Sequence, residues 1–143
     1  METSIRLEPF PDSPWGKVQL WQTLCPGVFW VITASHGGIV VDFARAKQVF
    51  SPAALECAFT ENDCYCFEEY RAGAVAIREL MDKGLFTAPV NMYFAAGQYE
   101  QIINKSVQRY YPEYWQVRER TLTAKNRPTS GRPATPKAKE RER

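Results

Sequence analysis

The chain has 143 residues, of which 45% are hydrophobic and 13% aromatic, a composition typical of a globular protein rather than of a disordered one. Its length predicts one domain, because domains usually contain ~100–200 residues. The longest apolar stretches, residues 28–32 and 39–41, are far shorter than the ~20 residues of a membrane-spanning helix. Residues 1–4 lack the basic and apolar regions of a signal peptide. We therefore expect a cytoplasmic protein without a membrane segment.

The net charge of +2 is unevenly distributed along the chain. Residues 116–143 carry nine Lys or Arg and three Glu, which gives +6, whereas residues 1–115 have a net charge of −4. The sequence thus predicts a mildly acidic folded part followed by a basic tail. Its four cysteines, Cys25, Cys57, Cys64 and Cys66, are expected to be free thiols, because the cytoplasm is reducing.

Residues 1–13 are expected to run extended over the surface. Beyond them, hydrophobic alternation and β-branched runs predict three strands, at residues 18–24, 28–33 and 39–41. Pro26-Gly27 and Gly37-Gly38 are turn signals between these strands. Short strands joined by tight turns favour a three-stranded antiparallel sheet.

The segments that follow are expected to be mostly helical. Helices are predicted at residues 44–48, 52–57, 64–71, 74–83 and 98–110. Asp42 is suited to cap the first helix, and Gly84 to close the fourth. Pro112 ends or kinks the last helix. The fold class expected from these elements is α+β, with the N-terminal sheet packed by about four helices.

The predicted domain boundaries follow the composition. Residues 14–115 are assigned to one α+β domain, preceded by the extended segment 1–13. After Trp115 the aromatic residues vanish, and prolines stand among polar and basic side chains. Such a segment buries too little apolar surface to offset its ordering entropy, so residues 116–143 are predicted to form a basic, largely disordered tail.

The most conspicuous local sequence is Ser35-His36-Gly37-Gly38, which contains the only histidine of the chain. The two glycines would let a ligand approach the backbone closely, which suits a functional site. Glycine pairs are also the usual chemistry of hairpin turns, with the histidine as an ordinary turn residue. The sequence favours the turn.

A second cluster, Glu61-Asn62-Asp63-Cys64, has two interpretations. At a helix N-terminus, Cys64 could be a nucleophile paired with His36 and oriented by Asp63 or Glu61. The neighbouring acids would instead raise its pKa, and free cysteines are commonly buried, so core packing is favoured. The spacing of the cysteines and His36 matches no zinc motif, and neither a metal nor a cofactor is predicted.

The aromatic run at residues 110–115 also allows two interpretations. Tyr111 and Trp115 could stack on single-stranded nucleic acid, or they could cap the core where the last helix ends. We favour the second. The basic tail could contact phosphates through counterion release or could be a solubilising extension, and the sequence leaves both open.

Taken in order, four short motifs resemble a family of bacterial domains carried on phages, plasmids and other mobile elements. They are Ser13-Pro14-Trp15-Gly16, Ala34-Ser35-His36-Gly37-Gly38-Ile39, Glu61-Asn62-Asp63-Cys64 and Tyr110-Tyr111-Pro112-Glu113. The resemblance covers residues 13–115. The chain departs from the family pattern at Asn62, and at Tyr65-Cys66 after the cysteine. The family offers no activity to carry over, but its context implies a role against host defence systems.

These observations lead to one functional hypothesis and two alternatives. The hypothesis is a non-enzymatic module that binds a host protein complex stoichiometrically, for example as an anti-CRISPR inhibitor of a nucleic-acid-binding defence complex. Its contact residues are predicted to be Trp15, Ser35, Gly37, Gly38, Tyr111 and Trp115. The first alternative is an enzyme, a hydrolase or a protein-modifying enzyme, that uses His36, Cys64, Asp63 and Glu61. The second is a nucleic-acid binder that acts through its tail.

Overall fold

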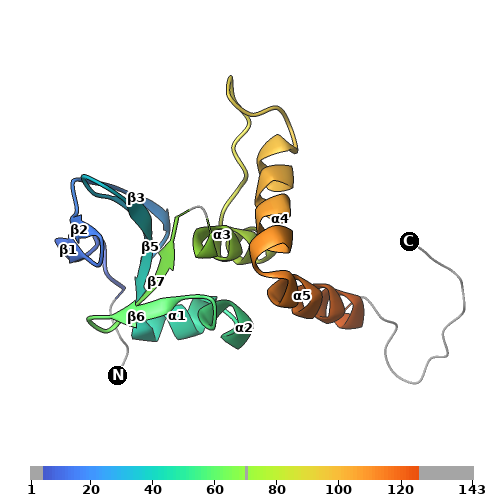
Figure 1. Ribbon diagram of the computed structural model, residues 1–143, viewed down its shortest axis with the longest axis horizontal. Helices are drawn as coiled ribbons and strands as arrows, with labels where there is room; N and C mark the ends of the chain where they lie inside the picture. Colours follow the sequence, from blue (N-terminus) through green and yellow to red (C-terminus); the bar gives the residue numbers. More distant parts are fainter. Residues whose placement is uncertain (1–4, 70, 126–143) are drawn as a thin grey trace, which may run out of the picture.

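The computed structural model describes residues 5–69 and 71–125. In chain order its elements are β1 (Asp12–Ser13), β2 (Gly16–Lys17), β3 (Leu20–Cys25), β4 (Val28–Ile32), β5 (Gly37–Asp42), α1 (Phe43–Val49), α2 (Pro52–Leu55), β6 (Phe59–Glu61), β7 (Cys64–Glu68), α3 (Ala72–Asp82), α4 (Gln98–Tyr110) and α5 (Pro112–Lys125). Figure 1 shows the strands on one side of the molecule and α3, α4 and α5 on the other. Within the described ranges, no helix is both long and apolar enough to cross a membrane.

The fold class is α+β as predicted, but the sheet is larger than expected. Strands β3, β4 and β5 form the predicted antiparallel meander. The prediction of three strands is wrong, because β7 pairs with β5 and β6 pairs with β7, giving a five-stranded sheet in the order β3-β4-β5-β7-β6. A separate two-stranded sheet joins β1 and β2.

The missed strand β7 occupies the segment predicted as the helix at residues 64–71. Its side chains alternate between two faces that are both covered, so its apolar pattern is continuous and was mistaken for a helix. Asn62 and Asp63 have φ angles of 53° and 66°, which are the two positive values of a type I′ hairpin turn. Residues 61–64, where a helix N-terminus was considered, therefore form the β6–β7 turn.

The other predicted helices are present with adjusted ends. The side chain of Asp42 accepts a hydrogen bond from the Arg45 N–H at 2.8 Å and caps α1, as predicted. After α3, Gly84 has a φ of 72°, and the N–H of Leu85 donates to the Leu80 carbonyl, which closes the helix in a Schellman motif. Helix α4 has the predicted bounds.

Helix α5 is longer than the sequence indicated. It begins at Pro112 and runs to Lys125, across the predicted domain boundary at residue 115 and into the start of the predicted disorder. It brings the number of helices in the described part to five. The remainder of the predicted tail, residues 126–143, lies outside the described residues.

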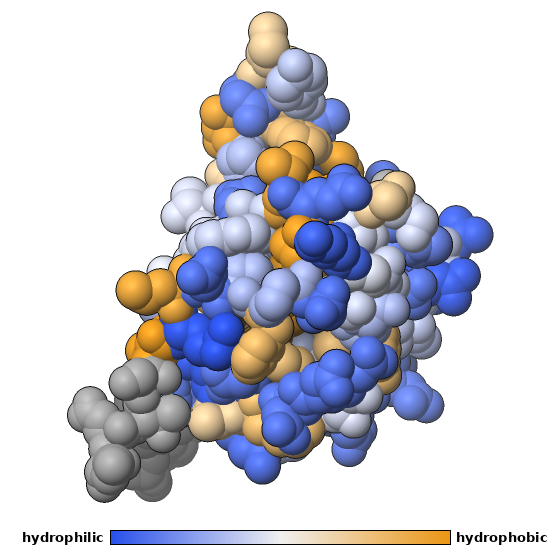
Figure 2. Space-filling view, turned by 90° about the vertical axis from the view of Figure 1, so that its left-hand side faces the viewer, coloured by the Kyte–Doolittle hydropathy of each residue, from blue (hydrophilic) through white to orange (hydrophobic). Residues whose placement is uncertain are grey.

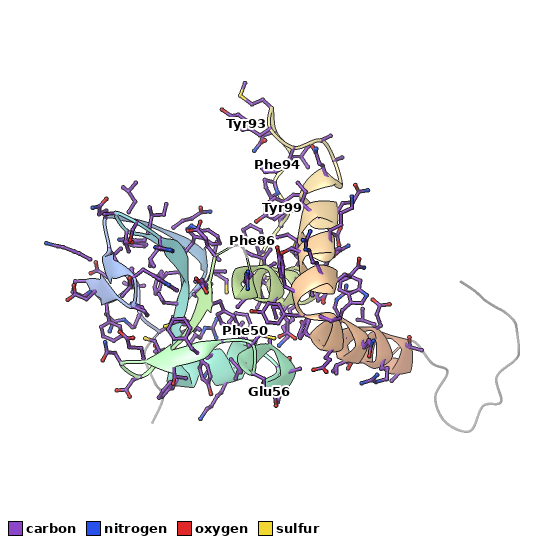
Figure 3. The ribbon with its side chains drawn as sticks, in the orientation of Figure 1. Phe50, Glu56, Phe86, Tyr93, Phe94 and Tyr99 are labelled. Carbon is purple, nitrogen blue, oxygen red and sulfur yellow. The ribbon has the colours of Figure 1, made fainter. Side chains whose placement is uncertain are left out.

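The connection between α3 and α4, residues 83–97, projects from the body of the molecule and forms its apex in Figure 2. Aromatic rings hold it on α4. Tyr99 of α4 lies between two rings of the connection, with ring centroids 5.2 Å from Phe94 and 6.2 Å from Phe86. Figure 3 shows these rings following one another from the tip towards α3.

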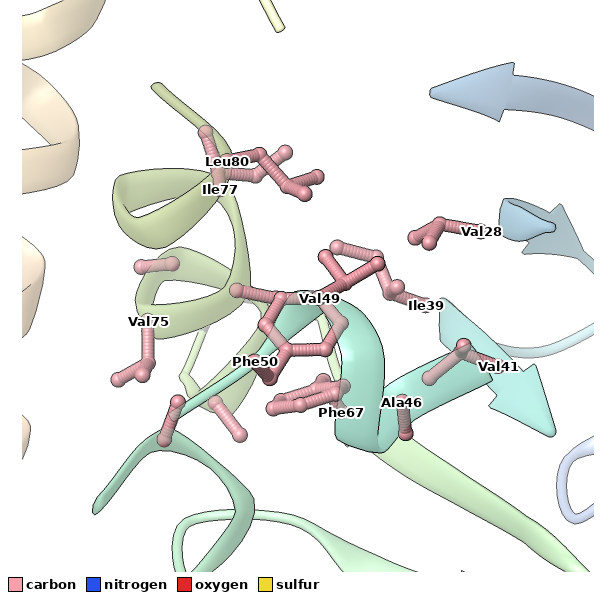
Figure 4. Packing of buried hydrophobic residues seen from close by; sticks show 14 of the residues in the cluster. Val28, Ile39, Val41, Ala46, Val49, Phe50, Phe67, Val75, Ile77 and Leu80 are labelled. Carbon is pink, nitrogen blue, oxygen red and sulfur yellow. The ribbon is translucent and has the colours of Figure 1, made fainter. Parts of the chain in front are cut away.

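The two faces of the five-stranded sheet are covered differently. One face packs against α1 and α3, where the rings of Phe50 and Phe67 lie 5.0 Å apart at the centre of the main core (Figure 4). The opposite face carries a smaller buried cluster, made of Phe29, Val31, Val40, Cys64 and Cys66. Residues 10–18, here called the strap, cover this second face through Trp15 and Val18.

Candidate functional site

The predicted motif at residues 35–38 forms the end of the β4–β5 hairpin. Thr33 closes the turn, because its N–H and its hydroxyl both donate to the His36 carbonyl, at 2.9 Å and 2.7 Å. Ser35 and His36 are exposed, whereas Gly37 and Gly38 are buried in β5. The motif lies at the end of a hairpin, as expected, with His36 in the turn. The predicted turn at Gly37-Gly38 is wrong, because both glycines pair with β4 as the first residues of β5.

Two of the predicted contact residues, the buried Gly38 and the half-buried Trp15, lie against each other. A Cβ atom at Gly38 would be 2.5 Å from Trp15 Cη2 and 2.5 Å from the Phe67 carbonyl oxygen. The Trp15 indole also meets the Phe59 ring edge-on at 6.0 Å. Only a glycine at position 38 leaves space for the indole on the sheet. The contact between Gly38 and Trp15 therefore holds the strap against the sheet.

His36 and Cys64 are not brought together. Strands β5 and β7 pair so that Gly38 lies opposite Glu68, at one end, and Asp42 opposite Cys64, at the other. At ~3.4 Å per residue, the six positions from His36 to Asp42 correspond to roughly 20 Å. A nucleophile and its base need hydrogen-bond contact, so these two residues do not form a catalytic pair in this fold.

The acid–cysteine segment instead lines a cavity between the strap and the sheet, with a volume of about 330 Å³. We call it the strap cavity. Its apolar floor consists of the half-buried Val18 and the buried Val40, Cys64 and Cys66. Exposed carboxylates form its rim, namely Asp12 of the strap and Glu61 and Asp63 of the β6–β7 hairpin. The hairpin turn is fixed to α1 by a hydrogen bond from the Phe43 N–H to the Asp63 carbonyl.

The two thiols of the floor are poor nucleophiles. Burial, together with the Asp42 and Asp63 carboxylates and opposed by Arg6, raises the pKa of Cys64 to about 11. Burial, with the neighbouring Cys64 and Glu61, raises the pKa of Cys66 to about 12. Both side chains are protonated near neutral pH, whereas a nucleophilic cysteine acts as the thiolate.

The described ranges contain no group of three or more His, Cys, Asp or Glu side chains placed to hold a metal ion. All four cysteines are free thiols. The chemistry that the strap cavity offers is therefore that of a negatively charged rim above an apolar floor.

Tyr111 and Trp115 lie where α4 meets α5. Both are half-buried and pack against the main core, and burial raises the pKa of Tyr111. The Arg118 guanidinium lies over the Trp115 ring, 4.7 Å from its centroid. The interpretation of this aromatic run as a cap on the core is confirmed.

A second candidate site, which the sequence analysis did not predict, is the tip of the connection 83–97. Val90, Met92 and Tyr93 are 65%, 86% and 76% exposed there. Within the tip, the Asn91 side chain accepts hydrogen bonds from the N–H groups of Tyr93 and Phe94. Apolar residues in a long segment without periodicity are the only signal that could have revealed it.

Together, the fold and these two sites define a small α+β domain with an acidic cavity and a projecting apolar loop. A model of the family described as a domain of unknown function, DUF7007, matches residues 9–140, so the chain belongs to this family. No curated protein and no solved structure matches the chain.

Proposed function

We propose that the protein is a non-enzymatic binding module that attaches stoichiometrically to a partner protein through the loop tip, Val90, Met92 and Tyr93. The observation that carries the proposal is the exposure of these three neighbouring side chains on a loop whose tip is braced by two hydrogen bonds of the Asn91 side chain. Methionine and tyrosine are enriched in protein interfaces. Hydrogen bonds of this kind reduce the conformational entropy that a loop loses when it binds.

The geometry of the predicted enzyme residues favours the same proposal. His36 lies at the far end of the sheet from Cys64, and the Cys64 pKa of about 11 leaves its thiol protonated near neutral pH. An enzyme that uses this pair would need the two side chains in hydrogen-bond contact and the Cys64 thiol ionised.

The class of partner that we propose is a host defence complex, with anti-CRISPR inhibition as one form of this function. The support is the resemblance to domains of mobile elements carried by the four motifs between Ser13 and Glu113. It is independent of the loop tip, and we test it separately.

The first experiment isolates partners from a bacterial lysate with the tagged protein, after nuclease treatment, and measures the affinity of the purified pair. Replacing Met92 and Tyr93 by alanine is expected to weaken binding at least ~10-fold, because exposed anchors of this kind carry much of an interface's affinity. The control is Ile102→Ala, which truncates an exposed apolar residue on α4. Undiminished affinity of the loop variant, or catalytic turnover of the partner, would overturn the proposal.

The second experiment challenges bacteria that have an active defence system with phage or plasmid. Expression of the protein is expected to restore infection or transformation, and the Met92/Tyr93 variant is expected to lose this effect. If a partner binds at the loop tip but the defence of the cells is unaffected, the host-defence role is refuted. The proposal of a binding module is then still supported.

A further inference from the structure

The strap cavity combines two features that suit one kind of ligand. Its volume of about 330 Å³ falls within the ~300–1,000 Å³ of ligand pockets. Its floor is apolar, whereas Asp12, Glu61 and Asp63 place carboxylates at the rim. A side chain that is apolar along its stem and positively charged at its end matches this arrangement, since lysine and arginine bury their stems while their charge stays at the surface.

The rim carboxylates are free to accept such a ligand. Among the described residues, no side chain or backbone group hydrogen-bonds to the carboxylates of Asp12, Glu61 or Asp63, and none forms an ion pair with them. Residues 48–69, which contain the hairpin, include five carboxylates and no Lys, Arg or His.

Two cations lie near the cavity without lining it. Arg6 stacks on the Phe10 ring at 3.6 Å, donates to the Glu8 carbonyl and faces a neighbouring hollow. Lys17 is the cross-strand partner of Asp12, with which it makes no ion pair. Arg6 is close enough to lower the pKa of Cys64 on the cavity floor. None of the residues that line the cavity carries a positive charge, whereas Asp12, Glu61 and Asp63 carry negative ones.

The acidic side chains of a second groove, between α2, α3 and α5, are not free to bind a ligand. It has a volume of about 480 Å³, but its acidic side chains are already occupied. Glu79 accepts hydrogen bonds from Ser51 and from the Tyr114 hydroxyl, and Asp82 pairs with Arg118 at 2.7 Å. The acidic side chains of this groove therefore connect the helices to one another, whereas the rim carboxylates of the strap cavity remain able to bind a cation.

We propose that the strap cavity binds the side chain of an arginine or lysine presented by the partner protein. The aliphatic stem lies on Val18 and Val40, and the charged group interacts with Glu61 and Asp63 in charge-assisted hydrogen bonds. This inference rests on the proposed function, for which it names a second contact and the chemistry of the partner at that contact.

The test uses small probes and needs no partner. N-acetyl-arginine amide and N-acetyl-lysine amide are titrated into the full chain and followed by amide chemical shifts. We expect saturable shifts in the strap and at residues 61–64, weakened by salt, and none with the neutral analogue N-acetyl-citrulline amide. Shifts confined to other regions, or equal shifts with the citrulline probe, would overturn the proposal.

Matched variants separate the site from general charge. The double variant Glu61→Gln/Asp63→Asn is expected to weaken arginine-amide binding at least ~10-fold, since each hydrogen bond between charged groups contributes substantially. Asparagine tolerates the left-handed conformation at position 63. The control Glu56→Gln/Glu68→Gln removes two exposed carboxylates outside the cavity. Equal weakening in the control would show that the effect comes from net charge alone and would refute the site.

The two proposals can fail separately. If the arginine amide does not bind the strap cavity, the proposal that a partner binds the loop tip is unaffected. If loop-tip variants lose the partner, the arginine-amide titration is expected to stay the same.

Discussion

Burial determines the chemistry of the cysteines that form the floor of the strap cavity. The pKa values of Cys64 and Cys66, about 11 and about 12, lie above the ordinary thiol value of 9.0. We expect both thiols to resist iodoacetamide at neutral pH in the native protein and to react quickly once the chain is unfolded. Mass spectrometry of the alkylated peptides measures this. Rapid native labelling of Cys64 would revive the nucleophile hypothesis.

The same two pKa values predict how stability depends on pH. Because the folded-state values are raised, the folded protein retains protons that the unfolded chain releases as the pH rises above 9. The thiol contribution to stability is therefore complete below pH 9 and declines between pH 9 and about 12. Chemical denaturation at several pH values tests the sign, with a Cys64→Ala/Cys66→Ala variant showing a shallower decline in this interval.

At the scale of elements, the seat of the strap on the sheet depends on Gly38. In Gly38→Ala the new methyl group would approach the Phe67 carbonyl, which is backbone and cannot rotate away. We expect a loss of roughly 1–3 kcal/mol in the free energy of unfolding, as for other overpacked sites. Thermal and urea denaturation measure it.

The control for this prediction is Ser35→Ala, at an exposed position in the turn that precedes β5. Its effect should stay within ~0.5 kcal/mol, as for most surface substitutions. A Gly38→Ala protein as stable as this control would show that the strap does not rest on the sheet as described.

Elements whose ends carry local signals were predictable from the sequence. Asp42 and Gly84 mark helix ends by side-chain capping and a left-handed conformation, and both were identified. Strand β7 was missed because both its faces are buried, so its pattern lacks the alternation that distinguishes a strand from a helix. The strap cavity and the loop tip depend on tertiary packing, to which a single sequence gives no access. The sequence singled out Glu61, Asp63 and Cys64, but as residues of an enzyme, and it assigned no role to the loop tip.

At the scale of the whole molecule, charge is divided between an acidic body and the basic C-terminal region. Helix α5 carries part of this basic region, and Arg118 is engaged with Asp82 of α3. The remaining basic residues from 126 onward are candidates for contact with phosphates, as the tail hypothesis holds.

Truncation after Lys125 tests this division of roles. The shortened protein keeps α5 whole and is expected to fold with an unchanged Tm and to retain its partner. A nucleic-acid role for the tail predicts instead that the full chain binds labelled DNA or RNA with an affinity that falls steeply with salt, and that truncation abolishes this binding. Fluorescence anisotropy at several salt concentrations measures both. Loss of the protein partner on truncation would place the interface on the tail.

The strand order β3-β4-β5-β7-β6 also bears on how the chain reaches its native state. Three of the four strand pairings join strands that are consecutive along the chain, and the fourth, between β5 and β7, encloses only α1, α2 and β6. Small loops lose little entropy on closure, and topologies rich in such local pairings fold quickly. The sheet can therefore assemble hairpin by hairpin during synthesis, before α4 and α5 have left the ribosome.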